Sequence, residues 1–245
     1  MTKVFDEQRE REEQYWEKIK HYFPENKWEE RKEWWLTGLP PDWKLAHFEL
    51  IDRLGIDVWK YCMLKGLGLH NFLRLIQEEL PPEGDILIAG TCQGGDVMAI
   101  RRTLPEHRNI VVIDSFAGLA EPVEQDHFDD GVLRQGAFAC QIEKYRQNFV
   151  DTGIQEPDEI YKMWITPKSL KRIKKRPLAM VFTDLDHYSP AKACYERFIP
   201  WVVKDGLILT HDYEFKNTPG VTKAAEEYAP GQWKRVYGSL ARLVR

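Results

Sequence analysis

Short apolar runs recur along the chain from residue 85 onward, separated by segments with apolar residues at helical spacing. The segments that predict strands are Ile86–Ala89, Ile110–Ile113, Glu159–Ile165, Ala179–Phe182 and Leu207–Leu209. Runs of this length are typical of parallel strands that are buried on both faces. The alternation of strands and helices therefore predicts an α/β fold with a mostly parallel, Rossmann-like sheet.

The last apolar segments of the chain follow a different pattern. Trp233–Tyr237 and Leu240–Val244 are separated only by Gly238 and Ser239, which predicts an antiparallel hairpin. A nicotinamide-binding Rossmann domain would normally supply a sixth parallel strand at this point. The predicted sheet therefore has parallel strands that are closed by a C-terminal antiparallel hairpin.

Before the first predicted strand the pattern is helical and rich in aromatic residues. Within residues 5–37 one helical face carries large apolar side chains, namely Trp16, Ile19, Tyr22 and Phe23. A second helical pattern extends from Trp43 to about Lys65. We therefore divide the chain into an α-helical N-terminal extension over residues 1–82 and a sheet-containing domain over residues 83–245. The extension packs against the domain or a partner subunit, or forms a lid over the ligand site, and these interpretations are compatible.

Composition and charge narrow the class of protein. A chain of 245 residues with a formal net charge of −4 fits one α/β domain with extensions and gives no electrostatic case for nucleic acid. The four cysteines are far apart and form no zinc-binding pattern, which is typical of a reducing compartment. The charged N-terminal segment is unlike a signal sequence, and no apolar run is long enough to cross a bilayer. We therefore expect a cytoplasmic protein that binds neither membrane nor nucleic acid.

A glycine-rich loop follows the first predicted strand directly. It reads Gly90-Thr91-Cys92-Gln93-Gly94-Gly95, and a helix is predicted from Asp96. The next strand ends at Asp114. Glycines let the backbone approach a ligand closely, and an acid at the tip of the second strand can accept hydrogen bonds from ribose hydroxyls. The pair indicates nucleoside binding, although the GxxxGG spacing differs from the GxGxxG of dinucleotide-binding folds.

Acidic residues and a histidine follow two further strands. Asp184 and Asp186 come after Ala179–Phe182, while His211 and Asp212 come after Leu207–Leu209. Because parallel strands end at the same edge of a sheet, we expect these side chains to crowd into one crevice. Such a cluster indicates either a bound cation or a proton-transfer task.

Each of these residues also has a structural interpretation. Asp184 and Asp212 could cap the helices that follow their strands, His211 could be a structural histidine, and Asp186 and His187 could face solvent. Similarly, the acidic stretch over residues 115–138 is either a solvated surface loop or a flap over the ligand.

Taken together, these motifs resemble the macrocin O-methyltransferase family, whose members methylate sugar hydroxyls during antibiotic biosynthesis. The resemblance covers roughly residues 84–228, and the most specific piece is Asp114-Ser115-Phe116-Ala117-Gly118-Leu119. It implies a class I methyltransferase fold. It also implies that S-adenosylmethionine is held by the glycine-rich loop and the strand end after it, through Gly90, Thr91, Cys92, Gln93, Gly94, Asp114, Ser115 and Phe116.

The resemblance further implies a Mg²⁺ site formed by Asp184 and the residue pair after the fifth strand. This chain has His211 where the family has the first aspartate of that pair, and Ile88 where the family has an acid at the end of the first strand. An imidazole suits a softer divalent ion better than Mg²⁺. We therefore expect Asp184, His211 and Asp212 to hold a divalent cation that is either Mg²⁺ or a softer ion.

The expected reaction is methyl transfer from S-adenosylmethionine to a hydroxyl of a small natural-product or sugar-like acceptor. By resemblance Asp184 is the base, and a neutral His211 is an equally good chemical candidate. One alternative is a metal-independent methyltransferase with His211 as the sole base. Another is a non-catalytic protein that binds S-adenosylmethionine. We also expect a homodimer.

Overall fold

The computed structural model describes residues 41–64, 66–128 and 131–244, together with a few residues before residue 41; for residues 41–47 it describes the backbone only. Of the predicted aromatic face, Trp16 is buried in a helix. Ile19, Tyr22 and Phe23 lie outside the described residues. Within the described part of the chain, no helix is long and apolar enough to cross a membrane.

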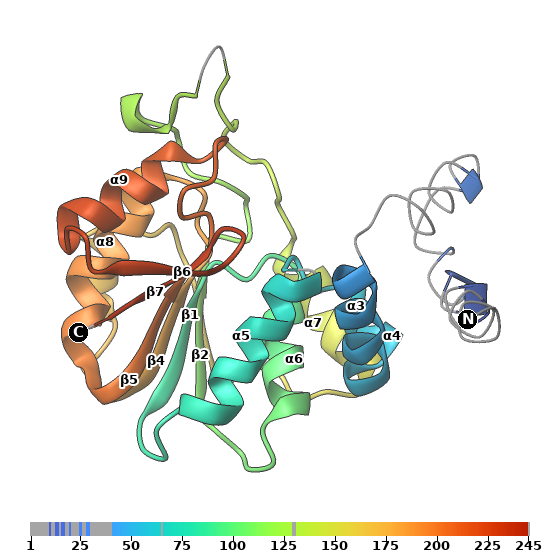
Figure 1. The fold of residues 1–245 in the computed structure, drawn as a ribbon. Helices are drawn as coiled ribbons and strands as arrows, with labels where there is room; N and C mark the ends of the chain where they lie inside the picture. Colours follow the sequence, from blue (N-terminus) through green and yellow to red (C-terminus); the bar gives the residue numbers. More distant parts are fainter. Residues whose placement is uncertain are drawn as a thin grey trace.

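A seven-stranded sheet with the order β3-β2-β1-β4-β5-β7-β6 forms the centre of the molecule (Figure 1). Strands β1 to β5 are parallel to one another, and β7 is antiparallel to both β5 and β6. This arrangement confirms the predicted fold class. The strands are β1 (Asp85–Ala89), β2 (Ile110–Asp114), β3 (Glu159–Lys162), β4 (Leu178–Thr183), β5 (Val202–Thr210), β6 (Trp233–Tyr237) and β7 (Leu240–Leu243).

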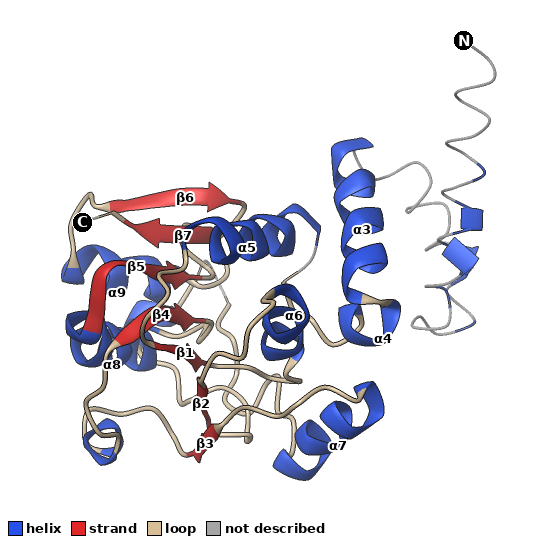
Figure 2. Ribbon diagram, turned by 90° about the horizontal axis from the view of Figure 1, so that it is seen from below, coloured by secondary structure: helices blue, strands red, loops and turns tan. Residues whose placement is uncertain are grey.

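Helices cover both faces of the sheet (Figure 2). On one face lie α3 (Pro41–Leu54), α4 (Ile56–Trp59), α5 (Gly66–Glu79), α6 (Gly95–Thr103) and α7 (Ile142–Thr152). On the other lie α8 (Tyr188–Phe198) and α9 (Pro219–Tyr228). Alternate residues of β1 point to opposite faces, so Ile86 and Ile88 join the first apolar layer and Leu87 and Ala89 the second. Both faces of the sheet are therefore covered by apolar side chains, as the unbroken apolar runs predict.

Several predicted elements have different bounds in the structure; the fifth strand, for example, begins at Val202 rather than Leu207. The third strand ends at Lys162 rather than Ile165, because its neighbour β2 ends at Asp114, opposite Lys162. A strand without a partner loses its hydrogen bonds, so the chain turns away there. The helix predicted from Trp43 to Lys65 is divided at Gly55, which has a φ of +73° and ends α3.

Candidate active site

The carboxyl ends of β1, β2, β4 and β5 meet at one edge of the sheet, where they surround a cavity. Its walls include Gly90, Asp114, Asp184, His211 and Asp212, which are far apart in sequence. The structure therefore brings together both the glycine-rich loop and the acidic cluster, as the parallel topology predicts.

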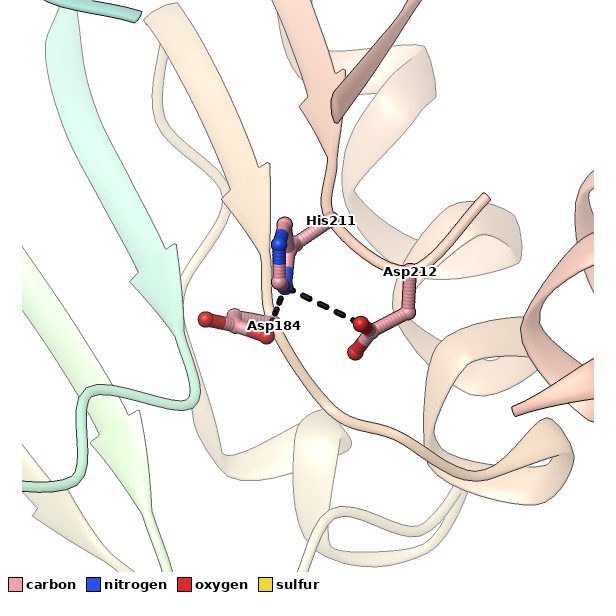
Figure 3. Close-up of side chains that lie close together, drawn as sticks. All are labelled: Asp184, His211 and Asp212. Carbon is pink, nitrogen blue, oxygen red and sulfur yellow. Dashed lines mark hydrogen bonds and ion pairs between the residues drawn. The ribbon is translucent and has the colours of Figure 1, made fainter. Parts of the chain in front are cut away.

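His211 lies between two carboxylates (Figure 3). Its Nδ1 is 3.1 Å from Asp184 Oδ1 and 3.1 Å from Asp212 Oδ1. Its Nε2 lies 3.0 Å from the hydroxyl oxygen of Ser239, in the turn of the C-terminal hairpin. Carboxylates only accept hydrogen bonds, so Nδ1 carries a proton in this arrangement.

Two opposing effects set the pKa of His211. Burial by itself lowers it, but the charges and hydrogen bonds of Asp184 and Asp212 outweigh burial, so the pKa is raised well above its usual value. Without a cation at these carboxylates, His211 is an imidazolium at neutral pH. In that state it has no free nitrogen lone pair to accept a proton.

One carboxylate beside His211 has an oxygen without a hydrogen-bond partner. Asp212 is 5% exposed, and its Oδ2 is buried without a hydrogen-bond partner. Ligand atoms of Asp184, His211 and Asp212 all lie within 4.8 Å of one another. An unpaired buried carboxylate oxygen is costly unless a cation or a donor approaches it, so this donor set fits a divalent cation.

Asp186 and His187 do not face solvent, which corrects that interpretation of the sequence. Asp186 is partly buried and lines the cavity, and His187 is 1% exposed. Burial, followed by the negative charges of Asp212 and Asp184, raises the pKa of Asp186 to about 8. In the metal-free protein, burial and these charges therefore favour the protonated form of Asp186.

Neither Asp184 nor Asp212 caps a following helix. The residues at the N-cap positions of α8 and α9 are His187 and Thr218. Asp212 instead has a left-handed backbone, with a φ of +63°, as does Asp186 at +57°. Left-handed non-glycine residues are strained and concentrate at functional sites, so their presence here supports a chemical role for this edge.

Asp114 connects the glycine-rich loop to the end of β2. Its Oδ2 accepts hydrogen bonds from the backbone N–H groups of Thr91 (2.9 Å) and Cys92 (3.2 Å), and its Oδ1 accepts one from Phe116 N–H (2.7 Å). Burial raises the pKa of Asp114 more than these hydrogen bonds lower it. A carboxylate offers about four lone-pair positions. Three of these positions accept the backbone hydrogen bonds, so one remains free to accept a hydrogen bond from a ligand hydroxyl.

The predicted cofactor residues divide into two groups. Gly90, Thr91, Cys92, Asp114 and Ser115 line the cavity. The other three lie behind it and shape the loop: Gly94 precedes α6 with a φ of +88°, the Gln93 carbonyl accepts a hydrogen bond from Asn148, and Phe116 packs edge-on against Tyr145.

Sequence analysis did not single out Asp96, which also lines the cavity. Its Oδ1 accepts hydrogen bonds from the Thr91 hydroxyl (2.7 Å) and Val97 N–H (2.8 Å). Burial raises the pKa of Asp96 to about 7. The sequence does contain a feature that could have identified Asp96. It is an acid in the first turn of the helix that follows the glycine-rich loop, and such an acid lies close to that loop.

The described part of the stretch over residues 115–138 is held by hydrogen bonds and lines the cavity at both ends, which favours the interpretation as a flap over that as a solvated loop. Its two arms are joined by hydrogen bonds from Leu119 N–H to the Ala137 carbonyl and from Gly136 N–H to the Leu119 carbonyl. Leu119 and Phe138 line the cavity. Asp126, which is 2% exposed, fastens the flap by accepting hydrogen bonds from Tyr188 N–H (2.6 Å) and Val123 N–H (2.9 Å). The flap thus supplies the missing N-terminal cap of α8.

Replacing Asp126 with alanine should lower the free energy of unfolding by about 0.5–2 kcal/mol, as for other lost caps. Asp126→Asn keeps one acceptor oxygen and should lose less. Urea denaturation measures both. The exposed neighbour Glu124 is the matched control. A Glu124→Ala protein as unstable as Asp126→Ala would contradict the capping role.

Comparison with known proteins gives a family and a fold. The family model described as macrocin-O-methyltransferase (TylF) matches residues 67–233. Among solved structures, the calicheamicin methyltransferase CalS11 is 18% identical with a TM-score of 0.60, over 84% of this chain and 93% of that chain. The O-methyltransferase NovP is 20% identical with a TM-score of 0.60, over 76% of this chain and 82% of that chain.

A second CalS11 structure, described as an apo TDP-rhamnose 3'-O-methyltransferase, is 17% identical with a TM-score of 0.54, over 95% of this chain and 92% of that chain. At these identities the structural likeness shows the fold alone. No curated protein matches the chain.

Proposed function

The chain belongs to the macrocin O-methyltransferase family of S-adenosylmethionine-dependent enzymes, and from this premise we propose that it methylates a hydroxyl of a sugar-like small molecule with the help of a divalent cation. The observation that carries the proposal is the cluster of Asp184, His211 and Asp212 in the same cavity as the glycine-rich loop. That arrangement supplies an acceptor site beside a cofactor site.

In this proposal Gly90, Thr91, Cys92, Asp114 and Ser115 contact the cofactor. The free lone pair of Asp114 accepts a hydrogen bond from the ribose, and Gln93, Gly94 and Phe116 hold the loop in shape. Asp96 lies at the same wall, where a carboxylate attracts the positively charged methyl donor. The transfer forms the O–CH₃ bond and breaks the S–CH₃ bond, so the cofactor loses its positive charge and the acceptor loses a proton.

Asp184, His211 and Asp212 would hold the cation. A divalent cation bound there would lower the pKa of the acceptor hydroxyl. The unpaired Oδ2 of Asp212 supports this role, and the imidazole of His211 favours an ion softer than Mg²⁺. Asp184 is the better base of the two candidates, because His211 would use its nitrogen lone pair as a ligand when the cation is bound, and the flanking carboxylates keep it protonated when no cation is bound.

Removal of divalent metal with EDTA should lower methyl transfer by about 10²-fold or more, consistent with the loss of metal-assisted deprotonation. We expect Mn²⁺, Co²⁺ or Zn²⁺ to restore activity at lower concentration than Mg²⁺. His211 must lose its proton to become a ligand. Calorimetry in buffers of different ionisation enthalpy should therefore show proton release, with metal affinity rising as the pH rises toward the raised pKa of His211.

Full activity after chelation would contradict the metal-assisted mechanism. It would favour His211 as the sole base, and the rate should then increase as the pH rises through the His211 pKa. Binding of S-adenosylmethionine without methyl transfer to any hydroxylated acceptor, in the presence of each metal, would favour the non-catalytic alternative.

The remaining expectations belong to the same proposal. Residues 1–82 form the helical extension and lid of the domain over residues 83–245, and support comes from Cys62, Met63 and Leu64, which line the cavity. The homodimer and the cytoplasmic location stay predictions. The four cysteines are free, as a reducing compartment would leave them.

A further inference from the structure

The turn of the C-terminal hairpin contacts the acidic cluster through Ser239. Its hydroxyl oxygen lies 3.0 Å from His211 Nε2, although the two residues are 28 positions apart in sequence. The Ser239 carbonyl accepts a hydrogen bond from Tyr213 N–H (2.9 Å). Two residues further on, Ala241 of β7 pairs with Thr210 of β5. Main-chain hydrogen bonds on both sides therefore fix the position of the Ser239 hydroxyl beside His211.

The two ring nitrogens of His211 face different groups. Nδ1 lies 3.1 Å from one oxygen each of Asp184 and Asp212, whereas Nε2 faces the Ser239 hydroxyl (Figure 3 shows the carboxylate side). A neutral imidazole has one nitrogen with a lone pair and one with a proton. In this orientation of the ring only Nδ1 can bind a cation that the two carboxylates also hold. Nε2 must then carry the proton and needs an acceptor, and Ser239 Oγ lies at hydrogen-bond distance.

The bonds of a histidine side chain do not by themselves fix the orientation of its ring. A half-turn about the Cβ–Cγ bond exchanges Nδ1 with Cδ2 and Nε2 with Cε1, and the preferences of this torsion are broad. After such a turn of His211 a C–H group would face the two carboxylates, and the ring would offer no lone pair to a cation there. The hydrogen bond from Nε2 to Ser239 opposes the turn, because the turned ring would present a carbon atom to the hydroxyl.

From these contacts we propose that Ser239 is a positioning residue for the cation site: it accepts the hydrogen bond of His211 Nε2–H and so keeps Nδ1 directed at the cation. This inference rests on the proposed function and adds the residue that determines which atom of His211 binds the cation. Ser239 does not line the cavity, so it acts through His211. Partners of this kind typically contribute about 10- to 100-fold to metal affinity.

Calorimetric titration of Zn²⁺ into the full chain at fixed pH tests the proposal. Ser239→Ala should weaken Zn²⁺ binding by about tenfold or more, whereas Ser239→Thr keeps the acceptor hydroxyl and should remain within about threefold of the wild type. Ser189→Ala is the matched control, because Ser189 is exposed and does not line the cavity. Urea denaturation shows whether each variant is folded. Equal Zn²⁺ affinities of the wild type and Ser239→Ala would overturn the proposal.

The same serine change in a His211→Asp background separates positioning from a structural role in the turn. An aspartate reaches only about as far as Nδ1 does and has no N–H group to donate to the hairpin. Ser239→Ala should therefore lower the Zn²⁺ affinity of the protein with His211 and leave that of the His211→Asp protein unchanged. An equal loss in both backgrounds would mean that the serine only supports the turn, and would overturn the proposal.

NMR spectra of protein with isotope-labelled histidine identify the binding atom. The signals of His211 are those that the His211→Asp protein lacks. In the Zn²⁺-loaded wild type they should show the proton on Nε2 and the metal on Nδ1; a bond from Zn²⁺ to Nε2 would contradict the proposal. Absence of Zn²⁺ binding by the wild type would refute the proposed cation site and this inference with it. Binding that is insensitive to Ser239→Ala would refute this inference alone.

Discussion

Asp184→Asn should lower kcat by about 10²–10⁴-fold, the range typical of a lost general base, while S-adenosylhomocysteine still binds. Asparagine has the same shape and can still accept a hydrogen bond from His211 Nδ1, which lies 3.1 Å from Asp184 Oδ1. It cannot take up a proton, and a neutral amide oxygen is a weaker cation ligand than a carboxylate. The expected loss is therefore in the chemical step and in metal affinity rather than in folding.

Steady-state kinetics with saturating metal separates these two losses, because excess metal can compensate for weak binding but not for a missing base. Asp205→Asn is the matched control. Asp205 is exposed, belongs to β5 and does not line the cavity, and its left-handed backbone tolerates asparagine. If Asp184→Asn retained more than half of the wild-type kcat at saturating metal, Asp184 would not be the base, and an unchanged metal affinity would show that it is not a ligand either.

The hydrophobic pattern of the sequence was sufficient to predict the central strands of the sheet and the edge at which the candidate site lies. The apolar runs of β1, β2 and β4 are buried on both faces, so their composition alone identifies them as central parallel strands. Topology then places Gly90, Asp114, Asp184 and His211 at one edge without further information. This is why the acidic cluster could be predicted from residues that are far apart in sequence.

The parts that the sequence did not predict depend on contacts between distant segments. Asp126 caps α8 from 62 positions away, and nothing in the periodicity of either segment encodes that hydrogen bond. The end of β3 depends on where its neighbour β2 stops. Phe116 belongs to the most specific motif of the chain, yet it packs against Tyr145 rather than lining the cavity. A motif thus identifies a segment, whereas packing decides which of its side chains face the ligand.

The charge state of His211 also required the structure. Its position after β5 was compatible with a ligand, a base or a structural histidine. Only the distances to Asp184 and Asp212 show that two carboxylates raise its pKa. Without a metal, His211 is therefore a cation that pairs with the two carboxylates. When a metal binds to the cluster, His211 would lose its proton and act as a neutral ligand.

Gly90→Ala should destabilise the protein more than the same change at a glycine that also has a left-handed backbone but has no close neighbours. Gly90 has a φ of +82°, and an added Cβ would overlap the backbone carbonyl oxygen of Asp184. The left-handed conformation costs about 1–2 kcal/mol for alanine. Overpacking typically adds about 1–3 kcal/mol, and a backbone atom cannot be moved away by a change of rotamer. Relief of the overlap requires β1 and β4 to separate at their carboxyl ends, which displaces Asp184.

Gly153→Ala isolates the first of these two effects. Gly153 has a φ of +65°, follows α7, and has nothing within 4 Å of an added Cβ. Urea denaturation of both variants should therefore show a larger loss for Gly90→Ala, and the difference between them measures the overlap with Asp184. Gly90→Ala should also weaken binding of both metal and S-adenosylhomocysteine, whereas Gly153→Ala should leave both unchanged. If Gly90→Ala and Gly153→Ala destabilised the protein equally and metal binding were intact, Gly90 would be needed only for its backbone conformation. The close contact between Gly90 and Asp184 would then not determine the position of Asp184.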